Sequence, residues 1–271
     1  MRVLSVALAL APALPVSPSV AAQSAAAQSA ADHVAMGDSA FEALKPDAAL
    51  AHYQAAIALD SLHYEANWKA ARAVADVAKQ IQGDARDLRE QRDSLYTVGR
   101  VYAEAAVRAR PDDAHGHYAL AMVLGRLSRT KGSKERVRFA RQIFDEASRA
   151  VAIDSAHDGA HHVLGAWHAE VRRLSGVQRF FAKTLFGGGF MNQASWDTAV
   201  WHLERAVAAR PEHVYHRLEL AEVLVDLKRY TQAREQLERI PELPVRDVLD
   251  EQYKREAAEL LERIKEEKDK A

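Results

Sequence analysis

Small and apolar residues recur along this chain in a pattern typical of paired helices. Four phrases share one layout, an alanine five residues before a serine or proline that ends a helix: 56–61, 106–111, 150–155 and 206–211. Proline lacks the amide hydrogen that a continuing helix needs. A polar turn and a new amphipathic run follow each phrase. The phrases recur at intervals of 50, 44 and 56 residues, and the amphipathic runs recur at the same intervals. The pattern predicts units made of one helix, a variable connection and a second helix.

The small residues of these units resemble those of the tetratricopeptide repeat (TPR), whose unit has roughly 34 residues. In the first unit, Gly37, Ala49, Tyr53 and Ala56 fall at the expected positions without a gap. The fifth unit also fits, and the middle three carry roughly 16, 10 and 22 residues beyond that period. The resemblance implies an all-α protein, a right-handed α-solenoid of about five TPR-like helix pairs with a C-terminal capping helix near 247–268. An irregular helical bundle is the alternative fold.

The first residues have the layout of an export signal. Arg2 gives a positive start, 3–14 is mostly apolar, and Val20-Ala21-Ala22 offers a cleavage site. The apolar run is shorter than the roughly 20 residues that cross a bilayer. An uncleaved N-terminal anchor is the alternative. We expect three segments: a signal peptide at 1–22, a flexible leader at 23–31, and an exported domain, periplasmic or secreted, at 32–271.

Composition excludes several classes of function. Among 271 residues there are 37 basic and 38 acidic ones, so the chain lacks the basic excess of nucleic-acid-binding proteins. It has no cysteine, which excludes disulfides, thiolate metal sites and a catalytic cysteine. The sequence also lacks the motifs of a nucleophile elbow, a P-loop and a dinucleotide-binding turn. We expect neither an enzyme nor a cofactor.

Four stretches give a narrower resemblance, and they occur in the order 67–73, 161–168, 174–187 and 199–206. The most specific are Leu164-Gly165-Ala166-Trp167 and Leu185-Phe186-Gly187. Together they resemble the regulator of microtubule dynamics family over about residues 32–265. The chain departs from that family where Gly187-Gly188-Gly189 replaces a turn with prolines, and we expect no counterpart of some eukaryotic members' membrane anchor. The resemblance implies a helical-repeat binding protein. It also raises lipid binding, reported for one branch, as an alternative. Eukaryotic roles at microtubules or organelle contacts are not expected of an exported protein.

The first helix of each unit should face the hollow side of the stack. Its groove-facing positions carry aromatic residues, arginines and carboxylates, and arginine can bind a carboxylate or phosphate through two hydrogen bonds. The same side chains could instead pack between helices, as aromatic stripes most often do. We predict a groove for a peptide or protein partner, formed by Trp68, Arg72, His115, Tyr118, Met122, Arg126, His162, Glu170, Leu218 and Glu222.

The insertion over about 174–194 is an amphipathic segment followed by a glycine break. Basic residues at 172, 173, 179 and 183 border its apolar face. In the alternative function, this face covers the groove and encloses a lipid or another hydrophobic small molecule, with a lid formed by Val177, Phe180, Phe181, Leu185 and Phe186. Two alternatives are open. The face could close over its own solenoid, or it could contact an anionic membrane as a peripheral segment.

Three histidines, His157, His161 and His168, share one stripe of a predicted helix. Metal sites use histidines at i and i+4, as His157 and His161 are placed. His168 lies two turns from His161, and no carboxylate completes a metal-binding motif. We therefore expect structural histidines and no metal site.

Overall fold

The computed structural model describes residues 20–269, with side chains from residue 29 onwards except those at 181 and 183. This part of the chain is helical and contains no strand. It consists mainly of five packed helix pairs: α1 (Val20–Glu42) with α2 (Pro46–Leu59), α3 (Tyr64–Lys79) with α4 (Arg86–Ala109), α5 (Ala114–Ser128) with α6 (Ser133–Ile153), α7 (Asp158–Arg173) with α9 (Trp196–Ala209), and α10 (Val214–Asp226) with α11 (Tyr230–Leu237).

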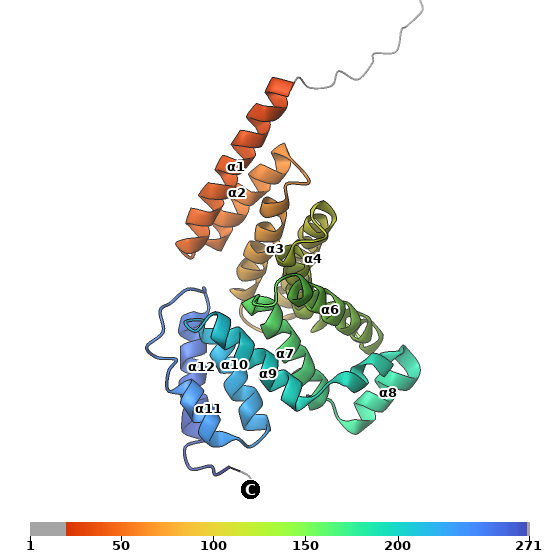
Figure 1. Ribbon diagram of the computed structural model, residues 1–271, viewed down its shortest axis with the longest axis vertical. Helices are drawn as coiled ribbons and strands as arrows, with labels where there is room; N and C mark the ends of the chain where they lie inside the picture. Colours follow the sequence, from red (N-terminus) through yellow and green to blue (C-terminus); the bar gives the residue numbers. More distant parts are fainter. Residues whose placement is uncertain (1–19, 270–271) are drawn as a thin grey trace, which may run out of the picture.

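Three further helices complete the stack (Figure 1). The insertion forms α8 (Gly176–Phe186) and the short 3-10 helix η1 (Gly188–Gln193), both between α7 and α9. The last helix, α12 (Asp250–Arg263), packs on α10 and α11. The prediction of an α-solenoid of five helix pairs with a terminal helix is confirmed.

The first helix begins earlier than the sequence predicted. Residues 23–31 belong to α1, which begins at Val20, so the prediction of a flexible leader is wrong. Alanine, which is abundant in this segment, has the highest helix propensity. Residues 1–19, most of the predicted signal peptide, lie outside the described part, and export stays a prediction. Among the helices that are described, none has the length and apolar character needed to cross a bilayer.

Small residues set the spacing within the helix pairs. A Cβ atom at Gly37 would lie 2.4 Å from the Tyr53 ring, and one at Gly165 would lie 2.6 Å from Cγ of Leu203. Carbon atoms in contact are normally about 3.5–4.0 Å apart. Tyr53 is fully buried with Ala49 and Ala56. The close approach expected from these small residues is present in the fold.

One polar contact recurs at the start of four helices. In each, a side chain donates a hydrogen bond to the carbonyl six residues earlier, at the last residue of a repeated phrase. The pairs are Asn67 with Ser61, His117 with Pro111, His161 with Ser155 and Arg217 with Pro211, at 3.1, 2.8, 3.1 and 3.0 Å. Buried carbonyl groups need such partners. Three different donor chemistries therefore fix the same turn between units.

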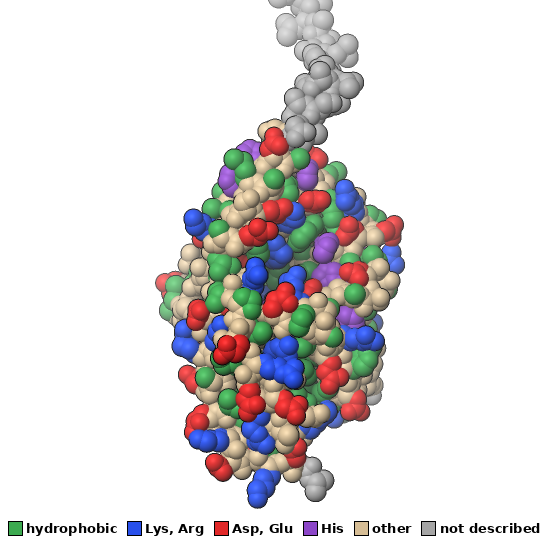
Figure 2. Space-filling model, turned by 60° about the vertical axis from the view of Figure 1, so that its left-hand side comes forward, with side chains coloured by type: hydrophobic (Ala, Val, Ile, Leu, Met, Phe, Trp, Pro, Cys, Tyr) green, Lys and Arg blue, Asp and Glu red, His purple; other side chains and the backbone are tan. Residues whose placement is uncertain are grey.

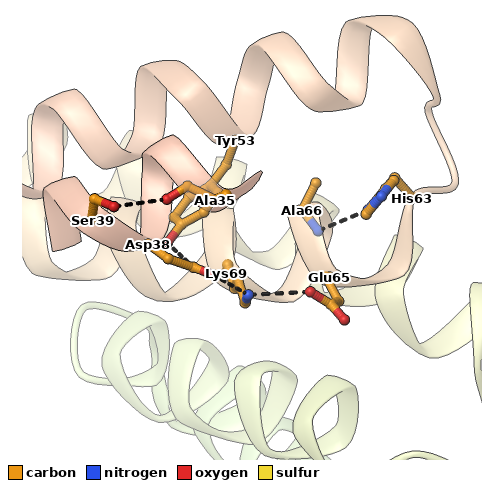
Figure 3. Close-up of polar contacts among 8 residues, drawn as sticks. All are labelled: Ala35, Asp38, Ser39, Tyr53, His63, Glu65, Ala66 and Lys69. Atoms are coloured by element: carbon orange, nitrogen blue, oxygen red, sulfur yellow. Dashed lines mark hydrogen bonds and ion pairs between the residues drawn. The ribbon is translucent and has the colours of Figure 1, made fainter. Parts of the chain in front are cut away.

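Asp38 joins the first three helices (Figure 3). Its carboxylate accepts a hydrogen bond from the Tyr53 hydroxyl of α2 at 2.8 Å and pairs with Lys69 Nζ of α3 at 2.7 Å. Lys69 also pairs with Glu65 at 3.2 Å. Burial and the Asp38 carboxylate raise the pKa of Tyr53 above its ordinary value. The contact holds the α1–α2 pair in place against α3.

The C-terminal segment folds back to the beginning of the stack. Asp247, just before α12, pairs with Lys79 at the end of α3 at 3.2 Å, and Gln82 donates to Gln252 of α12 at the same distance. Lys79 also pairs with Asp76 at 2.7 Å. Burial opposes the charged lysine, but Asp76 and Asp247 raise the pKa of Lys79 above its ordinary value. The segment preceding the terminal helix thus bridges the stack in addition to capping it.

Candidate functional site

The first helices of successive units line one hollow side, which we call the concave face. It is formed by α3, α5, α7 and α10, together with Tyr253 of α12. Figure 2 shows this side hollowed, with Lys, Arg and His side chains gathered around the hollow. Its two ends differ, and we call them the N-terminal half (α3 and the start of α5) and the C-terminal half (the rest of α5, α7 and α10).

In the N-terminal half, the predicted groove residues contact one another. Trp68 stacks on His115 with ring centroids 4.7 Å apart. The Arg72 guanidinium carbon lies 3.9 Å from the centre of the Phe41 ring and 5.2 Å from that of Trp68. Tyr118 packs over Gly159, where a Cβ atom would lie 2.5 Å from its ring. Here the aromatic and basic groups largely satisfy each other, although Arg72 Nε is buried without a hydrogen-bond partner.

The C-terminal half contains a pocket of about 330 Å³ between α5, α6, α7, α8 and α10. This volume falls within the roughly 300–1,000 Å³ of small-ligand sites. Four of the predicted groove residues line it: Met122, Arg126, His162 and Glu170. Its apolar walls include Val137, Ala140, Ile143, Val163, Trp167, Leu174, Ala182 and Met191.

The charges of this pocket are unevenly paired. The Arg126 side chain makes no hydrogen bond or ion pair with any residue that the structure describes, and its guanidinium carbon lies 5.9 Å from the centre of the Tyr215 ring. By contrast, the pocket carboxylates Glu170 and Glu219 both pair with Arg173, at 2.7 and 3.6 Å. The pocket therefore presents a cation without a counterion beside an apolar wall, which suits an anionic group attached to an apolar one.

A group of histidines lies beside the pocket. His216 contacts Asp158 Oδ2 through Nε2 at 3.1 Å and His162 through Nδ1 at 3.1 Å, and His213 stacks on it with centroids 3.9 Å apart. Burial, and then the neighbouring His216, lower the pKa of His213 to about 3 and that of His162 well below its ordinary value. His162 and His213 are therefore neutral at neutral pH, and His213 Nδ1 is buried without a hydrogen-bond partner. In the part of the chain that the structure describes, no three His, Asp or Glu side chains are arranged to hold a metal.

The predicted histidine stripe on α7 is divided among separate partners. His157 caps the helix by accepting from Ala160 N and contacts His115 at 3.1 Å. His161 contacts His202 at 2.8 Å, and His168 accepts from Ser195 N at 3.3 Å. These contacts explain the three side chains as structural ones, each serving a different joint between helices.

Two predicted groove residues on α10 lie elsewhere. Leu218 is only 1% exposed and belongs to the core between α9, α10 and α11, so its assignment to the groove is wrong. Glu222 does not line the pocket, and burial followed by the nearby Glu219 raises its pKa to about 7. Tyr215 and Glu219, one turn apart, face the pocket instead. Neither of these two was predicted as a site residue, although Tyr215 occupies a groove-facing repeat position.

The insertion is oriented differently from the predicted lid. Ala182 is buried and lines the pocket, and Phe186 packs against the central hydrophobic core. The side chains of Val177, Phe180 and Leu185 are 66, 62 and 64% exposed and do not line the pocket, so their assignment to a lid is wrong. The side chain of Phe181 lies outside the described residues. The small Ala182 is what allows α8 to pack closely with its other side inward.

Comparison with known sequences identifies the relatives of this chain. The sequence profile described as regulator of microtubule dynamics protein 1-3 matches residues 30–265, which include the insertion. The chain belongs to this family. Regulator of microtubule dynamics protein 3 of Xenopus laevis is 27% identical over 124 residues, covering 46% of this chain and 26% of that protein. Protein 1 of Bos taurus is 25% identical over 195 residues, covering 72% and 60%. The chain thus matches only about a quarter of the length of the Xenopus relative.

Solved structures show the fold of this family member. A thermophilic TPR protein of Thermus thermophilus superposes with a TM-score of 0.59 at 18% identity, covering 86% of this chain and 98% of that one. PilF of Pseudomonas aeruginosa superposes with a TM-score of 0.52 at 10% identity, covering 89% and 93%. These likenesses agree with a helical-repeat scaffold of the TPR type.

Proposed function

We propose that the concave face binds a peptide segment of a partner protein, with the pocket of the C-terminal half as its anchor. The observation that carries the proposal is Arg126, a half-buried cation that lines the pocket without a counterion. A charge that is withdrawn from water without a partner costs free energy. A carboxylate from the partner would supply the missing counterion, which would account for an arginine in the lining of this pocket.

The remaining pocket residues define what else the partner segment carries. Met122, Val163 and Trp167 offer apolar area next to Arg126, and His162 offers a neutral ring nitrogen. We infer a segment with an apolar side chain that enters the pocket and an acidic group close to it. The ring surfaces of Trp68 and His115 in the N-terminal half provide a second, flatter contact for a segment of this kind.

The experiment that tests this proposal is a selection of random peptides on the purified full chain, followed by fluorescence polarisation with the selected peptides. Arg126→Gln should weaken their binding at least tenfold, which corresponds to about 1.4 kcal/mol. Arg255→Gln, on an exposed position of α12, is the matched control and should bind as the unmodified chain does. Selected peptides without acidic residues, or equal binding by Arg126→Gln, would contradict the proposal.

A second candidate function is the binding of a lipid or another hydrophobic small molecule in the same pocket. The observation that favours it is the apolar wall formed by Val137, Ile143 and Met191, with Arg126 positioned for an acidic headgroup. Solvent extraction of the purified chain and mass spectrometry distinguish the two candidates. A stoichiometric amphiphile, lost when Ala166→Phe fills the pocket, would support the lipid candidate, and an empty pocket would leave the peptide candidate.

We also propose that the protein acts outside the cytoplasm, since residues 1–22 have the pattern of an export signal. Cell fractionation combined with N-terminal sequencing tests this. Material found outside the cytoplasm with a new N-terminus close to residue 23 is the expected result. An intact Met1 in the cytoplasmic fraction would contradict it.

A further inference from the structure

The helix α8 carries large apolar side chains that are mostly exposed to solvent. Val177, Phe180 and Leu185 are 66, 62 and 64% exposed, and they lie within one helix of 11 residues. Other large exposed apolar side chains that the structure describes include Leu62, in the turn between α2 and α3, and Val98 and Val101 on α4. A concentrated apolar row of this kind marks a contact surface, whereas isolated exposed residues need no explanation.

The charge around this row is all of one sign. No acidic residue occurs between Glu170 and Asp197, and the interval contains basic residues at 172, 173, 179 and 183. Arg173 is engaged by Glu170 and Asp226, at 2.7 and 2.8 Å. Arg172 and Arg179 have no ion pair among the residues described. Since the whole chain has a net charge of −1, this segment is a local positive region on a nearly neutral protein.

The inner side of α8 is fixed to the fold, which sets the direction of its outer side. Ala182 and Phe186 pack inward, and the capping box of Ser175 and Gln178 defines the start of the helix. Gly187, with a φ of 71°, ends it in the left-handed region that favours glycine. In Figure 1, α8 lies at one edge of the molecule, on the opposite side from α11 and α12.

We propose that α8 docks this protein onto an anionic lipid bilayer, with Val177 and Leu185 inserted at the interface and the positive charge of the segment 172–183 attracting the headgroups. An apolar face bordered by lysine and arginine binds anionic interfaces in this way. A folded partner or a second copy is less well suited, because one face of an 11-residue helix offers far less than the roughly 800 Å² per partner of a stable interface. The proposal does not depend on what the concave face binds.

Vesicle flotation of the full chain tests this docking. The probes are vesicles of phosphatidylcholine alone and vesicles with about one third phosphatidylglycerol, at low and at high salt. We expect at least tenfold more bound protein with the anionic vesicles, and a large decrease at high salt. The double variant Val177→Asp/Leu185→Asp should lose this binding at least tenfold, and Arg172→Gln/Arg179→Gln should lose the preference for anionic vesicles.

The matched control is Leu62→Asp/Val101→Asp, which places the same charges on similarly exposed apolar positions of the stack. It should bind vesicles as the unmodified chain does, and thermal melts should show that all variants are folded. No flotation of the unmodified chain would overturn the proposal, as would an equal loss in the control. Light scattering that shows a dimer abolished by Val177→Asp/Leu185→Asp would overturn it in favour of an interface between copies. Peptide binding that depends on Arg126 would persist in each of these cases.

Discussion

At the N-terminal half of the concave face, Trp68 stacks on His115, and the Arg72 guanidinium lies over the rings of Phe41 and Trp68. At the C-terminal half, Arg126 faces a pocket without a counterion, and His162 is held neutral by burial. The two halves use similar residue types. In the first half they mostly contact one another, with Arg72 Nε as the exception, and in the second half Arg126 lines a pocket without a counterion. Side chains that satisfy each other stabilise a fold, whereas those held in an unsatisfied state are typical of binding sites, which often reduce stability. The comparison predicts which substitutions will destabilise the protein.

The largest effect is expected where the beginning and the end of the stack meet. Lys79→Met leaves Asp76 and Asp247 as buried carboxylates without their cation. Breaking a buried ion pair in this way costs about 3 kcal/mol. The control, Lys265→Met, removes an exposed partner of Glu262 and should cost less than about 0.5 kcal/mol. Urea unfolding measures both, and a loss below about 1 kcal/mol for Lys79→Met would show that the bridge contributes little.

A smaller loss is expected from the N-terminal half. Trp68→Ala removes a half-buried ring that stacks on His115 and packs against the central core, and we expect a loss of about 2 kcal/mol. Thermal unfolding should show a clear decrease in Tm. An unchanged Tm would mean that this ring is not part of the satisfied half and is available to a ligand instead.

The pH dependence of stability should distinguish His213, whose pKa is lowered in the fold, from His117, whose pKa is raised. His213 has a pKa of about 3 in the fold, so the unfolded chain binds its proton first and stability is lost as the pH falls from about 6.5 towards 3. The hydrogen bond to Glu146 raises the pKa of His117, so its contribution is present below about pH 6.5 and is lost as the pH rises through the raised value.

Thermal melts of His213→Asn and His117→Asn over this pH range test the assignment. Relative to the unmodified chain, His213→Asn should become more stable as the pH decreases, by several degrees in Tm. His117→Asn should lose most at low pH. Equal pH profiles for the two variants would contradict the assignment of opposite shifts.

The smallest effect on stability, and the sharpest distinction between the halves, is expected for Arg126→Met. The substitution removes a half-buried cation without a partner and retains a long apolar side chain. Stability should be unchanged or increase by up to about 1 kcal/mol, although ligand binding is lost. A loss of about 2 kcal/mol or more would show that Arg126 is a structural residue.

The repeats could be predicted from the sequence because their signals are local. Alanines before each turn and the close approach at Gly37 depend on spacing within one unit, and the fold follows that spacing. The pairing of Lys79 with Asp247 joins residues 168 positions apart and leaves no periodic signal. Leu218 shows how far the sequence can predict which side of a helix is accessible. Neighbouring helix positions differ by about 100° in direction, so a small rotation of the helix exchanges its buried and accessible sides.

The orientation of α8 could not be predicted for a related reason. Both sides of this helix carry apolar residues, Val177 and Leu185 on one and Ala182 and Phe186 on the other. Periodicity identifies an amphipathic segment but does not decide which side packs inward. The orientation depends on tertiary contacts, which bury Ala182 and pack Phe186 against the central core. The pocket follows from the same contacts, since α8 supplies part of its wall.

Stacks of helical hairpins are usually elastic, because each hairpin contacts only its neighbours and small rotations add up along the array. The ion pair between Lys79 and Asp247 limits that freedom, because it connects hairpins that are not neighbours. The curvature of this superhelix is therefore constrained by a contact between distant units as well as by the packing of adjacent ones.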